Sequence, residues 1–236
     1  MDHLHIDWSQ LPTYNTIMAL FSGASLISVA HTGKKILTGE VNPKGWSLNF
    51  FVLGFVLTLT GAHMTLTWPL AKYFPFDNII FGEPVLALGV LNLVLSFLFW
   101  NKADEILHSI YPLQYICKLL SPLKIIFYGL GLMLISISIA GVNFEFFAAP
   151  KEEPVSGYFA DYPWLEAWGL SSVFFGAGVA AFLSAYFITH YQKQTIQTSW
   201  IAMLDYIALN VTGWFFLIFG ALNYYTHIGL ILKTGQ

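Results

Sequence analysis

The chain contains six stretches from which every Asp, Glu, Lys and Arg is missing. These charge-free stretches are residues 8–33, 45–71, 84–101, 125–144, 167–192 and 206–232. A helix that crosses the hydrocarbon core of a membrane needs about 20 consecutive, mainly apolar residues. The pattern therefore predicts an all-α integral membrane protein whose six transmembrane helices lie near 14–34, 46–68, 84–100, 124–144, 166–190 and 202–230.

The composition excludes other classes of protein. Only 10% of the 236 residues are charged, against roughly 25% in an average soluble domain. The mean hydropathy of +0.64 is too high for a soluble or disordered chain. All ten basic residues are Lys, so the chain lacks the Arg-rich basic surface that is typical of nucleic-acid binding, and no nucleic-acid partner is expected. We expect one membrane domain over residues 1–236.

Two connections are longer than the rest. Residues 101–123 mix charges with Ile, Leu and Tyr, which predicts an interfacial helix at about 101–121 that is broken near Pro112. Residues 145–165 are acidic and contain three Pro, which predicts a loop on the other side of the membrane. The lone Cys117 excludes an intrachain disulfide and any cysteine-based zinc or iron–sulfur site.

The distribution of Lys predicts how the chain is oriented. If the N-terminus is outside, the inner segments hold Lys34, Lys35, Lys44, Lys102, Lys118, Lys124 and Lys193, and the outer segments hold Lys72, Lys151 and Lys233. Cytoplasmic loops of membrane proteins carry an excess of Lys and Arg. We therefore expect a multi-pass protein of a prokaryotic cell (inner) membrane, with the N-terminus and the C-terminus both outside.

The second, fourth and sixth spans end alike, with a glycine and then a polar residue. The strings are Thr60-Gly61-Ala62-His63, Ala140-Gly141-Val142-Asn143 and Phe219-Gly220-Ala221-Leu222-Asn223. Two interpretations stay open. The spans form three helical hairpins whose polar ends converge on an outward-facing site, or the small residues serve only the close packing of membrane helices.

The most distinctive string is Thr67-Trp68-Pro69-Leu70 followed by Asn78-Ile79-Ile80-Phe81-Gly82-Glu83-Pro84. It resembles a family of small bacterial and archaeal polytopic membrane proteins known only as a domain of unknown function. The resemblance covers residues 67–84 and implies no established activity. Physically, we expect Pro69 to end a helix, Gly82 to adopt an unusual backbone angle and Glu83 to cap the next helix. The string is either a structural turn or part of a ligand or partner site.

Seven His residues raise the question of haem or metal binding. His31 lies about 5 Å and His63 about 25 Å from the inner ends of their helices, by the helical rise of 1.5 Å per residue. These two residues cannot hold one haem iron. His190 shares the level of His31, so His31 and His190 form the candidate haem pair, with both as interface residues as the alternative.

Polar residues are denser near the outer ends of the helices. His63, Glu83, Glu145 and His227 are candidate ligands for zinc, copper or iron, joined by His3 and His5 from the N-terminal segment. His3 also completes an N-terminal Met-Asp-His sequence that suits square-planar copper or nickel if the amine is free. The alternative is that these groups are hydrogen-bonded packing residues or line a small wet cavity.

Signatures of catalysis and transport are missing. The chain has no nucleophile elbow, phosphate-binding loop or dinucleotide fingerprint. Glu166 and Asp205 are expected to complement helix dipoles near helix starts, and no deep carboxylate for a proton relay is expected.

The sequence therefore favours an accessory or structural subunit of a membrane assembly, not catalytic on its own, with membrane-protein partners or copies of itself. Its alternatives are a metal- or haem-binding oxidoreductase subunit and a small-solute or ion transporter in which Glu83 or Asn143 takes part.

Overall fold

The computed structural model describes residues 6–8, 14–193 and 200–235, and every regular element in these ranges is a helix. The six long helices are α1 (Asn15–Leu37), α2 (Pro43–Thr67), α3 (Glu83–Asn101), α6 (Lys124–Phe144), α7 (Pro163–Tyr191) and α8 (Trp200–Thr234). The short elements are the π-helical turn η2 (Asn78–Gly82), α4 (Ala103–His108), α5 (Pro112–Leu120) and the 3-10 turns η3 (Ser121–Leu123) and η4 (Ser156–Phe159). Six helices are long and apolar enough to cross a membrane, which confirms the expected fold class.

The third span begins earlier than the sequence predicted. The turn η2 continues directly into α3, so the helix begins at Asn78 and not at Pro84. The buried Asn78 side chain accepts a hydrogen bond from the Leu70 amide at 3.1 Å and donates one to the Pro75 carbonyl at 3.0 Å. These bonds hold the connection from α2 against the helix start. The expectation for Gly82 was wrong, because its φ is helical, at −61°.

The segment predicted to be interfacial forms two short helices, α4 and α5. Pro112 begins α5, as the predicted break near this residue implies. The apolar side of α5 is buried, and its Ile116 and Cys117 join a core cluster with Ile36 of α1 and Ile188 of α7. This face therefore contacts the protein at the end of the bundle, and it is not left for lipid.

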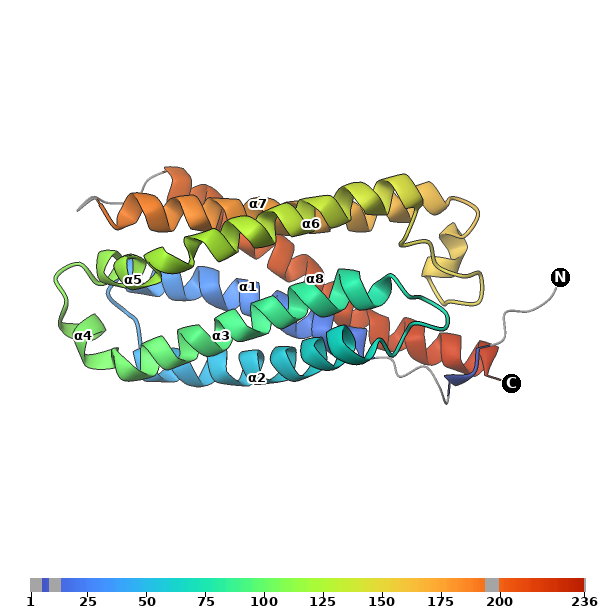
Figure 1. The fold of residues 1–236 in the computed structure, drawn as a ribbon, viewed down its shortest axis with the longest axis horizontal. Helices are drawn as coiled ribbons and strands as arrows, with labels where there is room; N and C mark the ends of the chain where they lie inside the picture. The colour runs from blue at the N-terminus through green and yellow to red at the C-terminus, as the bar shows by residue number, and fades with distance from the viewer. Residues whose placement is uncertain (1–5, 9–13, 194–199, 236) are drawn as a thin grey trace.

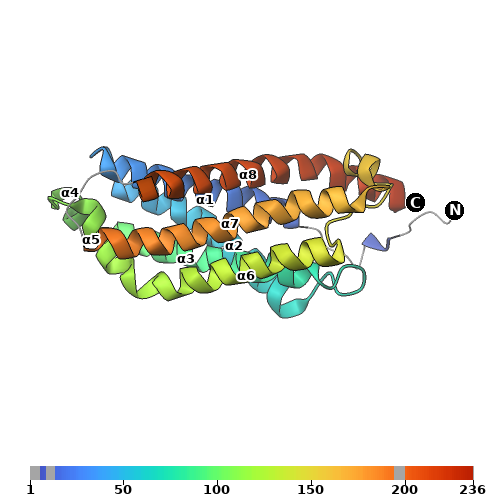
Figure 2. The ribbon, with the colours of Figure 1, turned by 90° about the horizontal axis from the view of Figure 1, so that it is seen from above.

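The six long helices associate as three close pairs, α2 with α3, α6 with α7, and α1 with α8 (Figures 1 and 2). The first two pairs are hairpins of consecutive spans. The third joins the first span to the last, so no short loop holds it together.

Glycines lie at the tight contacts within each pair, and those of the repeated strings are among them. A Cβ on Gly61 of α2 would lie 2.4 Å from the Leu86 nitrogen of α3, and a Cβ on Gly220 of α8 would lie 2.4 Å from the Leu20 nitrogen of α1. A Cβ on Gly141 of α6 would lie 2.3 Å from the Ser171 hydroxyl of α7. At Gly61 and Gly220 these nearest atoms are backbone, so only a residue without a side chain allows the helices to approach this closely. At Gly141 they belong to side chains. The repeat seen in the sequence therefore marks helix packing.

The polar residues that follow these glycines do not all point to one place. His63 and Asn143 are exposed, whereas Asn223 is buried. The hypothesis of a site made by all three repeats is therefore not supported by their burial.

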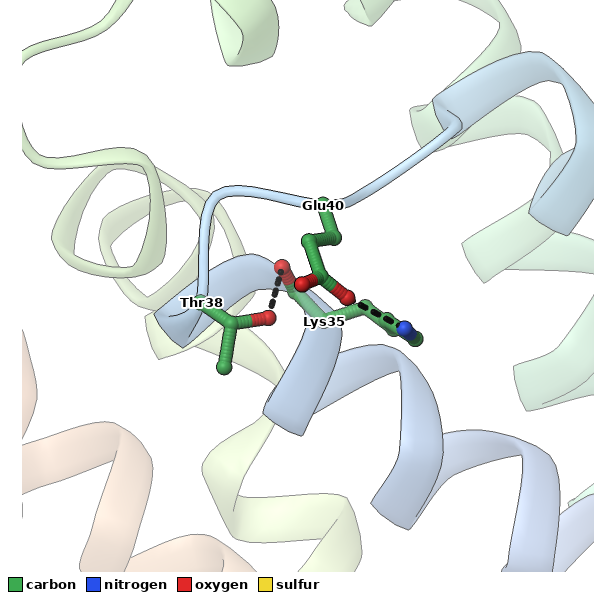
Figure 3. A network of polar contacts seen from close by, with 3 residues as sticks. All are labelled: Lys35, Thr38 and Glu40. Atoms are coloured by element: carbon green, nitrogen blue, oxygen red, sulfur yellow. Dashed lines mark hydrogen bonds and ion pairs between the residues drawn. The ribbon is translucent and has the colours of Figure 1, made fainter.

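The bundle has two distinct ends (Figure 1). The terminal end, as we call it, holds residues 6–8, the connections 68–77 and 145–162, and the end of α8. Trp8 Nε1 donates a hydrogen bond to Thr234 Oγ1 at 2.9 Å there. The opposite end holds residues 38–42, α4 and α5. At this end Gly39, with φ of 71°, terminates α1, and Lys35 pairs with Glu40 while Thr38 Oγ1 donates to the Lys35 carbonyl (Figure 3).

Candidate functional site

The interior of the bundle contains a cavity of about 780 Å³. Its walls come from α1, α3, α6, α7 and α8, and on α1 they extend from Asn15 to Leu37. By the helical rise this stretch is about 33 Å long. Most of the lining is apolar and includes Leu26, Leu88, Leu91, Leu130, Leu134, Phe174, Ala181 and Phe216. The cavity therefore extends along the membrane-spanning part of the bundle.

The cavity has an acidic wall at the terminal end. Asp77 precedes η2, Glu153 lies in the connection 145–162, and Glu166 is in the first turn of α7. Asn223 and His227, one helical turn apart on α8, line the same end. Three carboxyl groups, an amide and an imidazole from four segments thus border one end of an otherwise apolar space. We call Glu153, Glu166, Asn223 and His227, with Asn15 of α1, the acidic recess.

Within the recess the carboxyl groups have few partners. Glu166 Oε2 accepts a hydrogen bond from the Ala149 amide at 2.7 Å. The Thr226 hydroxyl bonds to Glu153, whose Oε1 lies 4.0 Å from His227 Nε2, beyond hydrogen-bonding distance. Burial raises the pKa of Glu153, and the nearby charge of Glu166 raises it further, although the Thr226 bond opposes both. Removal of water is therefore the main cost of ionising Glu153.

Asp77 lies at the same end of the cavity as the recess. Burial raises its pKa to about 7, from 3.8. No side-chain hydrogen bond or ion pair compensates for this burial within the described residues. Asp77 is therefore a carboxyl group that can gain or lose a proton near neutral pH.

Polar groups are sparse at mid-span. Asn92 of α3 is 1% exposed, and its Oδ1 accepts a hydrogen bond from Ser25 Oγ of α1 at 2.9 Å. Its Nδ2 also donates to the Leu88 carbonyl at 2.7 Å. Ser22, one turn before Ser25, lines the cavity, and its hydroxyl is buried without a partner among the described residues. The pair Ser25–Asn92 is therefore satisfied, whereas Ser22 is available to a guest.

A single carboxyl group lines the cavity near the opposite end. Asp205 of α8 is 8% exposed, and its Oδ1 accepts a hydrogen bond from Ser184 Oγ of α7 at 2.9 Å. Lys34 also lines this end, with Nζ 5.8 Å from the centre of the Tyr206 ring. Asp205 lies in the second turn of α8, so it is buried in the protein and faces the cavity near one end of the helix.

The residues predicted to bind metal are dispersed. Glu83 and Glu145 are exposed and, like His63, do not line the cavity, whereas His227 does. His3 and His5 lie outside the described residues. Within the ranges that the structure describes, no group of three or more His, Cys, Asp or Glu residues is placed to hold a metal ion. The metal site stays a prediction that nothing in the structure supports.

His63 contacts protein groups. Its Nδ1 lies 2.6 Å from the Tyr14 hydroxyl. Burial raises the pKa of Tyr14 to about 12, so the hydroxyl keeps its proton and can donate it to the imidazole. This bond occupies Nδ1 of the imidazole, and Nε2 lies 3.5 Å from Thr67 Oγ1.

The proposed haem pair has aromatic neighbours. The His31 ring centre lies 6.2 Å from that of Tyr206, and the His190 ring is stacked on Tyr186 of its own helix with the centres 6.4 Å apart. Both His residues are half-buried, and neither lines the cavity. A shared haem between them stays a prediction.

Sequence reasoning missed most of the polar residues that line the cavity. Glu166 and Asp205 were interpreted through helix dipoles, and Asp77, Glu153 and Asn92 were not singled out. One signal was present, because Asn223 and His227 are four residues apart and therefore share a helix face.

The chain matches one family model over most of its length. That model is described as "Protein of unknown function (DUF981)", and the match covers residues 11–229. No curated protein and no solved structure matches the chain.

Proposed function

Because the chain belongs to the DUF981 family of proteins of unknown function, we propose its role from the cavity alone: it binds an elongated, mainly apolar molecule within its membrane-spanning bundle. The observation that carries this proposal is the 780 Å³ cavity with apolar walls and polar ends. Sites for small molecules usually measure about 300–1,000 Å³ and combine apolar walls with a few polar groups. The cavity meets both criteria.

The energetics favour an occupied cavity. Apolar side chains that line an empty space lose the packing contacts that a filled core would make, so an occupant in contact with these walls is stabilising. Apolar cavities do not hold ordered water, so the guest must itself be largely apolar. A length of about 33 Å, similar to the roughly 30 Å hydrocarbon core, suits a lipid-like chain.

The test is to identify a molecule that co-purifies with the protein and then to fill the cavity with a larger side chain. Native mass spectrometry of the purified chain should show a bound lipid-like molecule. Ala181→Phe places a ring in the cavity and should abolish that mass difference. Leu132→Phe is the matched control, because Leu132 is 62% exposed on α6 and does not line the cavity. Retention of the guest in folded Ala181→Phe protein, or no guest in the wild type, would contradict the proposal.

A transport role is the second candidate, favoured by the buried Asp205. The cavity has carboxyl groups near both ends, and carboxyl groups inside membrane domains often mark solute or proton pathways. Glu83 and Asn143, the residues first expected to affect transport, do not line it. Flux in proteoliposomes should fall in Asp205→Asn and persist in Asp104→Asn, an exposed control near the opposite end. Equal flux in both variants would exclude a role for Asp205.

We also retain the accessory role and the orientation as proposals. An accessory subunit predicts that the native protein co-purifies with membrane partners or with copies of itself, and a lone monomer would contradict it. The terminal end holds Lys72, Lys151 and Lys233 and is proposed to face outside. In a Cys117→Ser background, Tyr158→Cys should react with an impermeant thiol reagent in intact cells and Ile110→Cys should not. Tyr158 is 87% exposed at the terminal end, and Ile110 is 85% exposed at the opposite end.

A further inference from the structure

Three groups of the acidic recess present oxygen acceptors to the cavity. The recess contains the carboxyl groups of Glu153 and Glu166 and the Oδ1 atom of Asn15, which is buried and has no partner among the described residues. A carboxylate only accepts hydrogen bonds. Any ligand that satisfies this wall must therefore supply N–H or O–H donors.

Asn223 is a polar side chain that the fold leaves without a partner. Its relative exposure is 9%, it lines the cavity, and its side chain makes no hydrogen bond within the described part of the chain. A buried amide without partners costs about 1–3 kcal/mol. Because it lies one turn from His227 on the same helix face, Asn223 borders the space beside the two carboxyl groups. This amide is therefore placed to bond to a polar group of a ligand in the recess.

No lysine within the described residues supplies a cation to the recess. The described Lys residues of the terminal end do not line the cavity. Lys151 pairs instead with Asp161 at 2.7 Å, and the Lys72 ammonium lies over the Tyr73 ring at 5.1 Å. His227, at 4.0 Å from Glu153, is the one basic group close to the carboxylates in the described ranges. Two carboxyl groups thus face a low-dielectric space with one imidazole.

From this arrangement we infer that the head group held in the acidic recess is a primary amine, so that the ligand is a long-chain amine with its ammonium at the terminal end and its chain along the cavity. The inference rests on the proposed function. An ammonium supplies three donors and a positive charge, which matches the acceptors of the recess and its charge. A phosphate or carboxylate head group would place negative charge beside Glu153 and Glu166 and is therefore disfavoured.

The experiment compares three probes that share one chain and differ in the head group. Hexadecylamine, hexadecanol and hexadecyl phosphate are titrated into the purified full-length chain in a nonionic detergent at neutral pH, and binding is measured by calorimetry. Hexadecylamine should bind at least about tenfold more tightly than the phosphate, which equals ~1.4 kcal/mol. Equal binding of all three probes, or a preference for the alcohol or the phosphate, would overturn the amine inference and leave the apolar cavity as proposed. Binding of none would overturn the proposed function itself.

Single substitutions in the recess test which residues cause the preference for the amine. Glu153→Gln and Glu166→Gln keep the shape of the side chain and remove its charge, and each should reduce the preference for the amine by about tenfold. Glu145→Gln is the matched control, because Glu145 is exposed at the same end and does not line the cavity. An unchanged preference in both recess variants would overturn the assignment. The wild-type comparison of the three probes decides the inference even if a variant fails to fold.

Discussion

The tight crossing of α1 and α8 can be tested with one methyl group. A Cβ on Gly220 would lie 2.4 Å from the nitrogen and 2.8 Å from the Cα of Leu20, whereas ordinary contact begins at 3.4 Å. Gly220→Ala therefore requires the backbones of α1 and α8 to move about 1 Å further apart at this crossing. Both atoms belong to the main chain, so no side chain can rotate away. Overpacking of this kind costs about 1–3 kcal/mol.

The gain in helix propensity opposes this cost only in part. Replacing Gly by Ala in a helix stabilises it by up to about 1 kcal/mol. We expect a net loss of about 1–2 kcal/mol in Gly220→Ala, which corresponds to a fall in Tm of roughly 2–8 °C for a chain of this length. Gly129→Ala on α6 is the control, because a Cβ there meets nothing within 4 Å. Its Tm should stay constant or rise by roughly 2–4 °C.

Thermal unfolding followed by circular dichroism, at one scan rate and in one detergent, measures both shifts. Gly61→Ala repeats the test in the α2–α3 pair, where a Cβ would lie 2.4 Å from the Leu86 nitrogen. If Gly220→Ala and Gly129→Ala shifted Tm equally and in the same direction, the close approach of α1 and α8 would be refuted.

Three further predictions concern protonation, hydrogen bonding and metal. The pKa of Asp77 is raised to about 7, from 3.8, so the folded state holds a proton that the unfolded state loses. Stability therefore falls as pH rises between these values. Tm should be lower at pH 8 than at pH 5, and Asp77→Asn should reduce this difference in Tm. An unchanged difference in the variant would contradict the burial of Asp77. Ser25 Oγ and Asn92 Oδ1 are 2.9 Å apart. A double-mutant cycle of Ser25→Ala and Asn92→Leu should therefore show a coupling free energy of unfolding of about 0.6–2 kcal/mol. Strictly additive effects of the two substitutions would argue against the hydrogen bond. Elemental analysis of the purified protein tests the predicted metal site. About one zinc, copper or iron ion per chain that is lost in His63→Ala would support the site, and the absence of stoichiometric metal would refute it.

Helix positions were predictable because they depend on local composition. A membrane helix satisfies its own backbone hydrogen bonds, so an apolar, charge-free stretch is enough to define each span. The start of the third span was not predictable, because Asn78 begins it through bonds to Leu70 and Pro75. Those bonds depend on how the preceding connection folds back, which composition does not encode.

The candidate site was predicted poorly. Depth arguments located residues along the membrane normal but did not show which side of a helix each residue occupies. His63 and His227 were both expected near the outer surface, yet His63 contacts Tyr14 and His227 lines the cavity. Asp205 was interpreted from its place near a helix start, whereas the structure shows that it also faces the cavity.

The sequence by itself determined the environment and the number of spans, because both follow from the polarity of residues along one segment. Only the tertiary structure decided that α1 pairs with α8, that the three helix pairs enclose a cavity, and that Glu153, Glu166 and Asn223 border one end of it. The physical reason is that a cavity and its lining are properties of how helices face one another. The sides of two helices that face each other are set by packing between segments that are distant in the chain, such as Gly220 against Leu20.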